Sequence, residues 1–123
     1  MIIGIGTDIV EIERLDKALA NIKTHCFSPA EIAHCDKYRD ALTHYAGRWA
    51  AKEALAKALG TGFGADCAWD ELEILNNESG KPEMHLSGNA LKTFEKLGGK
   101  LIHLSIAHEK KYASAFVIIE GEK

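Results

Sequence analysis

Asp8 is the first residue of this chain whose type and position could support chemistry, and two interpretations of it are open. It follows a short apolar segment, residues 2–6. It could cap a helix that begins there, because a carboxylate accepts hydrogen bonds from the free N–H groups of a first helical turn. It could instead be a metal ligand at the end of a strand. Mg²⁺ suits such a position, because it takes one or two carboxylates and completes its octahedron with water and substrate phosphate.

Glu53 and Lys57 are four residues apart in a segment, 48–59, that is rich in alanine and leucine. The simple interpretation is an ion pair on a helix surface. The alternative is that Glu53 is a second metal-binding carboxylate and that Lys57 is a cation beside a phosphate. The segment favours the alternative, because it has no wide polar face and therefore indicates a helix covered on most sides.

Arg48 and Lys52 lie in the same segment, with no acidic residue three or four positions away. Burying a cation is costly unless it is paired. We therefore expect both side chains to need an anion from outside, and a phosphate-bearing ligand would serve.

His108 ends an apolar segment beside a turn and is either a solvated histidine, a donor to an anion or a proton carrier. The glycine-rich segment 60–64 resembles a phosphate loop in composition, but it follows a helix, whose C-terminal dipole has the wrong sign for an anion. Gly60 is better interpreted as a helix C-cap. A glycine there still lets a ligand pass close to the backbone, so Gly60 is a candidate ligand-binding position.

The elements that position these residues begin with a short strand, whose Gly4 and Gly6 predict a bulge or a close approach of another group. At Asp8 the strand is expected to give way to a helix. The apolar residues of that helix recur at helical spacing: Ile9, Ile12, Leu15 and Leu19.

Ser28-Pro29-Ala30-Glu31 is a capping box that predicts a short helix through about Cys35. A long helix is expected from near Asp40 to Leu59. After it come a hairpin with strands near residues 72–74 and 84–86, a helix capped by Ser87 and closed by Gly98-Gly99, and strands over 100–107 and 112–120. The order β-α-α-α-β-β-α-β-β predicts an α+β fold with a mostly antiparallel sheet and a long central helix, in one domain of 123 residues.

The formal charge of −3 excludes a global attraction to nucleic acid or to an anionic membrane, and no segment reaches the length of a membrane span or resembles a secretion signal.

Three cysteines without a C-x-x-C motif argue against a disulfide framework and a structural zinc site, so reduced thiols in the cytoplasm are expected. Four histidines show no metal-ligand spacing: His25, His34, His44 and His85. No nucleophile motif is present, so an enzyme of this kind would receive its nucleophile with a substrate.

Three stretches together, 4–9, 48–57 and 103–108, resemble the holo-[acyl-carrier-protein] synthase family of the 4'-phosphopantetheinyl transferase superfamily. The resemblance covers the whole chain in order and length, and Gly80-Lys81-Pro82 also fits it. It implies an enzyme of fatty acid biosynthesis that moves the phosphopantetheine arm of coenzyme A to a serine of apo acyl carrier protein. The other product is adenosine 3',5'-bisphosphate.

The resemblance also implies roles for individual residues. Asp8 and Glu53 match Mg²⁺ ligands, and Lys57 matches the lysine that faces the reacting phosphate. Arg48 and His108 match residues that contact coenzyme A, with His108 directed towards the adenosine 3'-phosphate.

Partners follow from the same resemblance. Arg14 matches a basic position that meets the acidic carrier protein. Short members of the family are homotrimers with active sites between subunits, which allows His108 to serve a neighbour's site. Ala107 stands where the family usually has serine or threonine, so one hydroxyl contact is lost.

Three questions stay open at the level of the sequence. The base that takes the serine proton is either Glu53 or a magnesium-bound water, and the water is favoured because a carboxylate committed to a metal is a poorer base. A non-catalytic assembly module with the same fold is an alternative function. A transferase for peptide-synthetase carrier domains is a further one, which the short chain disfavours.

Overall fold

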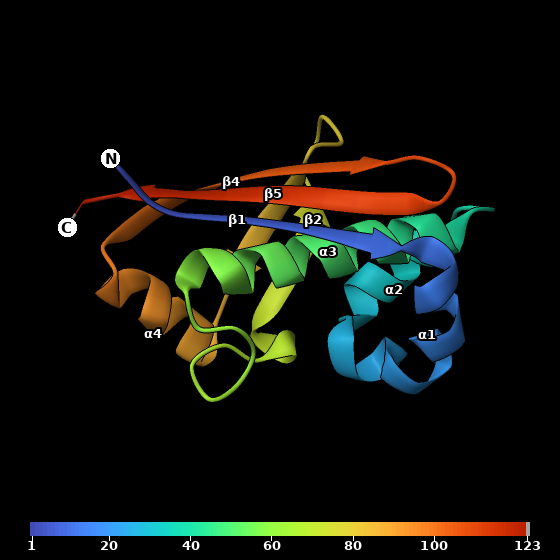
Figure 1. Ribbon diagram of the computed structural model, residues 1–123, viewed down its shortest axis with the longest axis horizontal. Coiled ribbons are helices and arrows are strands. Elements are labelled where there is room, and N and C mark those ends of the chain that lie inside the picture. Colours follow the sequence, from blue (N-terminus) through green and yellow to red (C-terminus); the bar gives the residue numbers. More distant parts are fainter. Residues whose placement is uncertain (123) are drawn as a thin grey trace.

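The computed structural model describes residues 1–122 and contains a three-stranded sheet, a two-stranded hairpin and four α-helices (Figure 1). Both sheets are antiparallel, and the predicted order of elements and α+β class are confirmed. A short 3₁₀ helix, η1, precedes the hairpin. In chain order the elements are β1 (Ile2–Glu11), α1 (Ile12–Cys26), α2 (Pro29–Asp36), α3 (Ala41–Leu59), η1 (Trp69–Glu71), β2 (Leu72–Asn76), β3 (Pro82–Leu86), α4 (Gly88–Lys96), β4 (Gly99–His108) and β5 (Tyr112–Gly121).

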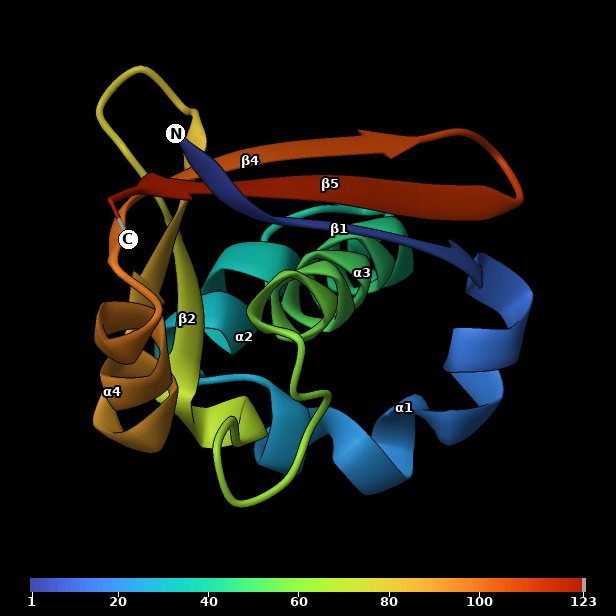
Figure 2. The ribbon, with the colours of Figure 1, turned by 60° about the vertical axis from the view of Figure 1, so that its left-hand side comes forward.

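The three-stranded sheet has β5 in its centre, between β1 and β4. All four helices lie on one face of this sheet, which leaves the other face open (Figures 1 and 2). Strand side chains alternate between the two faces. The open face therefore carries large apolar side chains that are each 54–67% exposed: Ile5, Ile9, Leu101 and Phe116.

The long helix α3 lies against β1 because two glycines remove the side chains that would separate them. A Cβ atom on Gly6 would overlap the carbonyl oxygen of Ala54, and one on Gly4 would overlap that of Ala58. The close approach predicted from the two glycines is thus confirmed, and the alanines of α3 provide the surface that β1 contacts.

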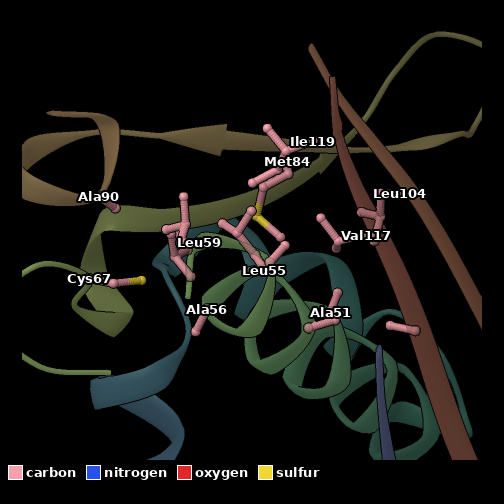
Figure 3. Close-up of a cluster of buried hydrophobic side chains, with 14 of the residues drawn as sticks. Ala51, Leu55, Ala56, Leu59, Cys67, Met84, Ala90, Leu104, Val117 and Ile119 are labelled. Atoms are coloured by element: carbon pink, nitrogen blue, oxygen red, sulfur yellow. The ribbon is translucent and has the colours of Figure 1, made fainter. Parts of the chain in front are cut away.

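The main core fills the space between α3, the three-stranded sheet and the hairpin (Figure 3). Leu55 of α3 points towards Met84 of β3 and towards Val117 and Ile119 of β5 in that view. Three of these four side chains are completely buried, and Met84 is 9% exposed. Burial of such side chains contributes roughly 1.5–3 kcal/mol each, which holds α3 in place under the sheet.

The start of α1 differs from the prediction. The strand β1 continues to Glu11, where it still pairs with Tyr112, and Asp8 lies within the strand opposite Ala115. The helix begins only at Ile12. The interpretation of Asp8 as a helix cap is therefore wrong, because pairing with β5, a contact distant in sequence, keeps the chain extended past Asp8.

The helix ends were predicted with mixed success. The capping box of Ser28 and Glu31 is confirmed, and Gly60 closes α3 in the left-handed conformation at φ = 81°. Ser87 occupies the N-cap position of α4, but its side chain makes no capping hydrogen bond. The carboxylate of Glu71 caps this helix instead, by accepting hydrogen bonds from the N–H groups of Asn89 and Ala90 at 2.6 and 3.2 Å.

Cys26, Cys35 and Cys67 are buried and unbridged. Burial raises the pKa of each thiol to about 11, so none is a nucleophile at neutral pH.

Within residues 1–122, no helix has the length and apolar character needed to cross a bilayer.

Candidate active site

Asp8 and Lys57 meet at the contact between β1 and α3. The Nζ of Lys57 lies 3.1 Å from Oδ1 of Asp8 and donates to the carbonyl oxygen of Thr7 at 3.0 Å. Asp8 is two residues after Gly6 and so shares its face of the strand, which is the face turned to α3. The Asp8 side chain is 17% exposed and that of Lys57 is 53% exposed, so the pair is open to a ligand.

Glu53 is close enough to this pair for all three charges to interact. Burial raises the pKa of Glu53, the negative charge of Asp8 raises it further, and the positive charge of Lys57 lowers it. The simpler of the two interpretations, an ion pair between Glu53 and Lys57, is wrong: within residues 1–122 the carboxylate paired with Lys57 is that of Asp8, 49 residues away. A cation bound beside the two carboxylates would offset the repulsion from Asp8 that contributes to the raised pKa of Glu53.

The donor set fits Mg²⁺ better than a transition metal. Within residues 1–122 no three side chains from histidine, cysteine, aspartate or glutamate are grouped to hold a metal. Asp8 and Glu53 would supply two oxygen ligands, and an octahedral ion would take its remaining ligands from water and phosphate oxygens.

Arg48 and His108 lie elsewhere, towards the N-terminal end of α3. Arg48 is nine residues before Lys57, which is about 14 Å along a helix. It is only 5% exposed, and its Nη2 donates to Oδ1 of Asn76 at 2.5 Å. Its Nε is buried and finds no hydrogen-bond partner among the described residues. The expectation that Arg48 requires an anion is therefore consistent with its surroundings.

His108 contacts the same end of α3 through His44, with 6.1 Å between the ring centroids. The structure therefore brings the predicted site residues together in two groups. One group contains Asp8, Glu53 and Lys57, and the other contains Arg48 and His108, whose charges both act on His44.

The expectation for Lys52 is wrong. Its Nζ donates to Oε1 of Glu31 and to the carbonyl oxygen of Cys26, both at 2.7 Å, and the side chain is buried. The anion that pairs with Lys52 is thus supplied by α2 rather than by a ligand. Helical spacing could not reveal this partner, because Glu31 is 21 residues away in the sequence.

The remaining candidates, Arg14 and Gly60, are both accessible. Arg14 is exposed on α1 and forms no ion pair with the other described residues. A Cβ atom on Gly60 would have nothing within 4 Å, so the space beside it is open.

Comparison with known proteins decides the family. Residues 4–117 match the sequence model of the 4'-phosphopantetheinyl transferase superfamily. The chain belongs to this superfamily. A relative named holo-[acyl-carrier-protein] synthase from Syntrophus aciditrophicus is 41% identical over 127 residues, with 100% of this chain and 99% of the relative covered. This transferase is therefore an enzyme of the holo-[acyl-carrier-protein] synthase type.

Solved structures of the superfamily confirm the fold. A holo-(acyl-carrier-protein) synthase from Bacillus anthracis, in complex with CoA (3',5'-ADP), is 34% identical with a TM-score of 0.84, and 99% of each chain is covered. The synthase from Helicobacter pylori in complex with coenzyme A is 30% identical with a TM-score of 0.82. There, 94% of this chain and 99% of the other are covered.

Proposed function

We propose that this transferase moves the 4'-phosphopantetheine arm of coenzyme A to a serine of apo acyl carrier protein and releases adenosine 3',5'-bisphosphate. The observation that carries the proposal is the convergence of Asp8, Glu53 and Lys57 at the contact between β1 and α3. The sequence pattern of these residues resembles that of the family, and the two solved relatives named above contain coenzyme A or part of it. The product would serve fatty acid biosynthesis.

Mg²⁺ is the proposed cofactor, and Asp8 and Glu53 would hold it. When bound, Mg²⁺ neutralises charge on the pyrophosphate and on the departing bisphosphate. Lys57, whose side chain is half-exposed beside Asp8, would donate to a phosphate oxygen of the substrate. Transfers of this kind depend mainly on positioning and on charge stabilisation, so the enzyme needs no nucleophile of its own.

The second group would hold the nucleotide. The buried Nε of Arg48 offers an unused donor, and the exposed His108 can reach a phosphate. Gly60 follows the C-terminal end of α3, three residues after Lys57, and lies next to open space where the ligand can pass close to the backbone.

Two protein partners are proposed. Arg14 is exposed on α1 and would contact the acidic carrier protein. A homotrimer of this chain would cover the open sheet face, whose apolar side chains a monomer leaves in water. In such a trimer the active sites would lie between subunits, so that one copy's His108 serves another copy's Asp8 and Glu53.

The three unbridged cysteines fit a reducing compartment such as the cytoplasm.

The proposal is tested by incubating the protein with coenzyme A, Mg²⁺ and several apo carrier proteins, followed by intact mass measurement. We expect the carrier to gain one phosphopantetheine group, and a carrier whose serine is replaced by alanine to gain nothing. If folded protein modifies none of the carriers, the proposed function is wrong. Light scattering at several concentrations tests the trimer separately.

A further inference from the structure

Three histidines and a tyrosine form a ring cluster at the N-terminal end of α3. We call His34, Tyr38, His44 and His108 the imidazole cluster. The rings of Tyr38 and His44 are stacked, with centroids 3.7 Å apart and planes at 16°. The ring centroids of His34 and His108 lie 6.4 and 6.1 Å from that of His44. His44 is thus the point where three segments distant in sequence meet: the end of α2, the start of α3 and the end of β4.

The charges around the cluster are mostly positive. Arg48 lies close enough to His34 and His44 for its charge to lower the pKa of both, and Lys37 acts on His34 in the same direction. The acid that faces the cluster is Asp40, whose Oδ1 is 3.5 Å from Nε2 of His44. Burial is the largest cause of the lowered pKa of both histidines. Without a ligand, His34 and His44 are therefore mainly neutral at pH 7.

The groups around this cluster favour the binding of a phosphate. It places imidazoles beside a guanidinium whose Nε is buried and has no partner among residues 1–122. A phosphate dianion would accept hydrogen bonds from these donors, and its charge would offset the repulsion between Arg48 and a protonated imidazole. Tyr38 covers one face of the His44 ring and so fixes the plane in which its nitrogens point.

We propose that His44 is an additional phosphate-binding residue of the nucleotide site, and that the imidazole cluster takes up protons from solvent when a nucleotide phosphate binds. This proposal rests on the proposed function, and it adds residues that the family pattern did not indicate. No covalent bond changes in the step: each proton moves from water to an imidazole nitrogen, and the phosphate remains bound to the nucleotide.

The test is calorimetric titration of the intact protein with adenosine 3',5'-bisphosphate and Mg²⁺, in two buffers of different ionisation enthalpy. The difference between the buffers measures the net proton exchange, which includes protons that the phosphates lose on binding, and the difference between the wild type and a His44 variant isolates the uptake by the cluster. For the wild type we expect proton uptake by the cluster at pH 7 and affinity several-fold higher at pH 6 than at pH 8, since coupling to about one pKa unit allows at most a tenfold change. His44→Phe keeps a ring against Tyr38 but has no nitrogen, and it should lose most of the uptake and the pH dependence.

Two controls isolate the cluster. His85→Gln replaces an exposed histidine outside it and should behave as the wild type does. Adenosine 5'-monophosphate lacks the 3'-phosphate and should bind with less proton uptake. NMR titration of the wild-type histidines, with and without the bisphosphate, should show a raised pKa in the cluster on binding, and this measurement needs no variant.

The outcomes separate the two proposals. If the bisphosphate binds the wild type without proton uptake, or if His44→Phe retains the full uptake, the role of His44 is wrong while the transferase function stands. If the carrier is not modified and the bisphosphate does not bind at any pH, both proposals are wrong.

Discussion

The Nζ of Lys52 lies 2.7 Å from Oε1 of Glu31, and both side chains are at most 1% exposed. Glu31 also accepts hydrogen bonds from the N–H groups of Ser28 at 2.8 Å and Ile74 at 2.9 Å. The pair therefore joins α2, α3 and β2. Burial lowers the pKa of Lys52, and the neighbouring Glu31 opposes that shift, so the lysine is held charged by its partner.

Lys52→Met should destabilise the protein strongly, because it leaves the Glu31 carboxylate buried and without its counter-ion. Loss of one partner of a buried pair costs about 3–5 kcal/mol. The measurement is the free energy of unfolding in urea. Lys57→Met is the matched control, since its ion pair is half-exposed and its removal should cost less than ~1 kcal/mol. Equal losses in the two variants would contradict the assignment.

Gly6→Ala should separate β1 from α3. The new Cβ would overlap the carbonyl oxygen of Ala54, which is rigid helix backbone. Overpacking of this kind costs about 1–3 kcal/mol, and displacement of β1 also moves Asp8 away from Lys57, so activity should fall together with the melting temperature. Gly64→Ala meets nothing within 4 Å and should leave both unchanged. A fully active Gly6→Ala protein would show that this contact does not position the site.

Asp8→Asn should reduce carrier modification by at least about 100-fold, or ~2.7 kcal/mol, while the fold stays intact. The asparagine keeps the shape of the side chain but removes the charge that would bind Mg²⁺. The rate of carrier mass gain is measured over a range of Mg²⁺ concentrations. Asp66→Asn, in the exposed loop after α3, is the control and should be fully active. An Asp8→Asn enzyme with normal Mg²⁺ dependence would remove Asp8 from the metal site.

Arg14→Glu should raise the KM for the acyl carrier protein and leave the KM for coenzyme A near its original value. The reversed charge repels an acidic partner, and the effect should weaken as salt is added because exposed charges are screened. Lys92→Glu on α4 makes the same charge change on an exposed site of another helix and should have little effect. Equal changes in both KM values would place Arg14 outside the docking surface.

The ligand-free protein should lose stability as the pH falls from 7.5 to 5.5. His34 and His44 have a pKa below the ordinary value of 6.5 when folded, so the unfolded chain binds protons more readily. The stability that these residues contribute is therefore present above pH 6.5 and is lost as the pH falls towards their folded pKa. Melting temperatures across this range should change less in a His34→Gln, His44→Gln double variant. An unchanged slope in that variant would show that other groups control the acid transition.

Local sequence signals were reliable where the physics is local. The capping box at Ser28 and Glu31, the C-cap at Gly60 and the long apolar helix depend on neighbours within a few residues, and each was predicted correctly. The pair Gly4 and Gly6 correctly predicted a close approach of another group, although its partners, Ala54 and Ala58 of α3, are distant in the sequence. Asp8 and Glu53 could be selected because the family pattern joins two distant stretches.

Contacts between distant segments decided the rest. Pairing with β5 kept Asp8 in a strand, Glu31 neutralised Lys52, Asp8 rather than Glu53 paired with Lys57, and Glu71 rather than Ser87 capped α4. Spacing along one helix contains no information about which acid on another element will reach a buried lysine. For the same reason His34 and His44 looked unremarkable in the sequence, and only the folding of α2, α3 and β4 onto one another brought them to His108. The sequence by itself thus determined the elements and the reactive residue types, whereas tertiary packing decided which charges meet.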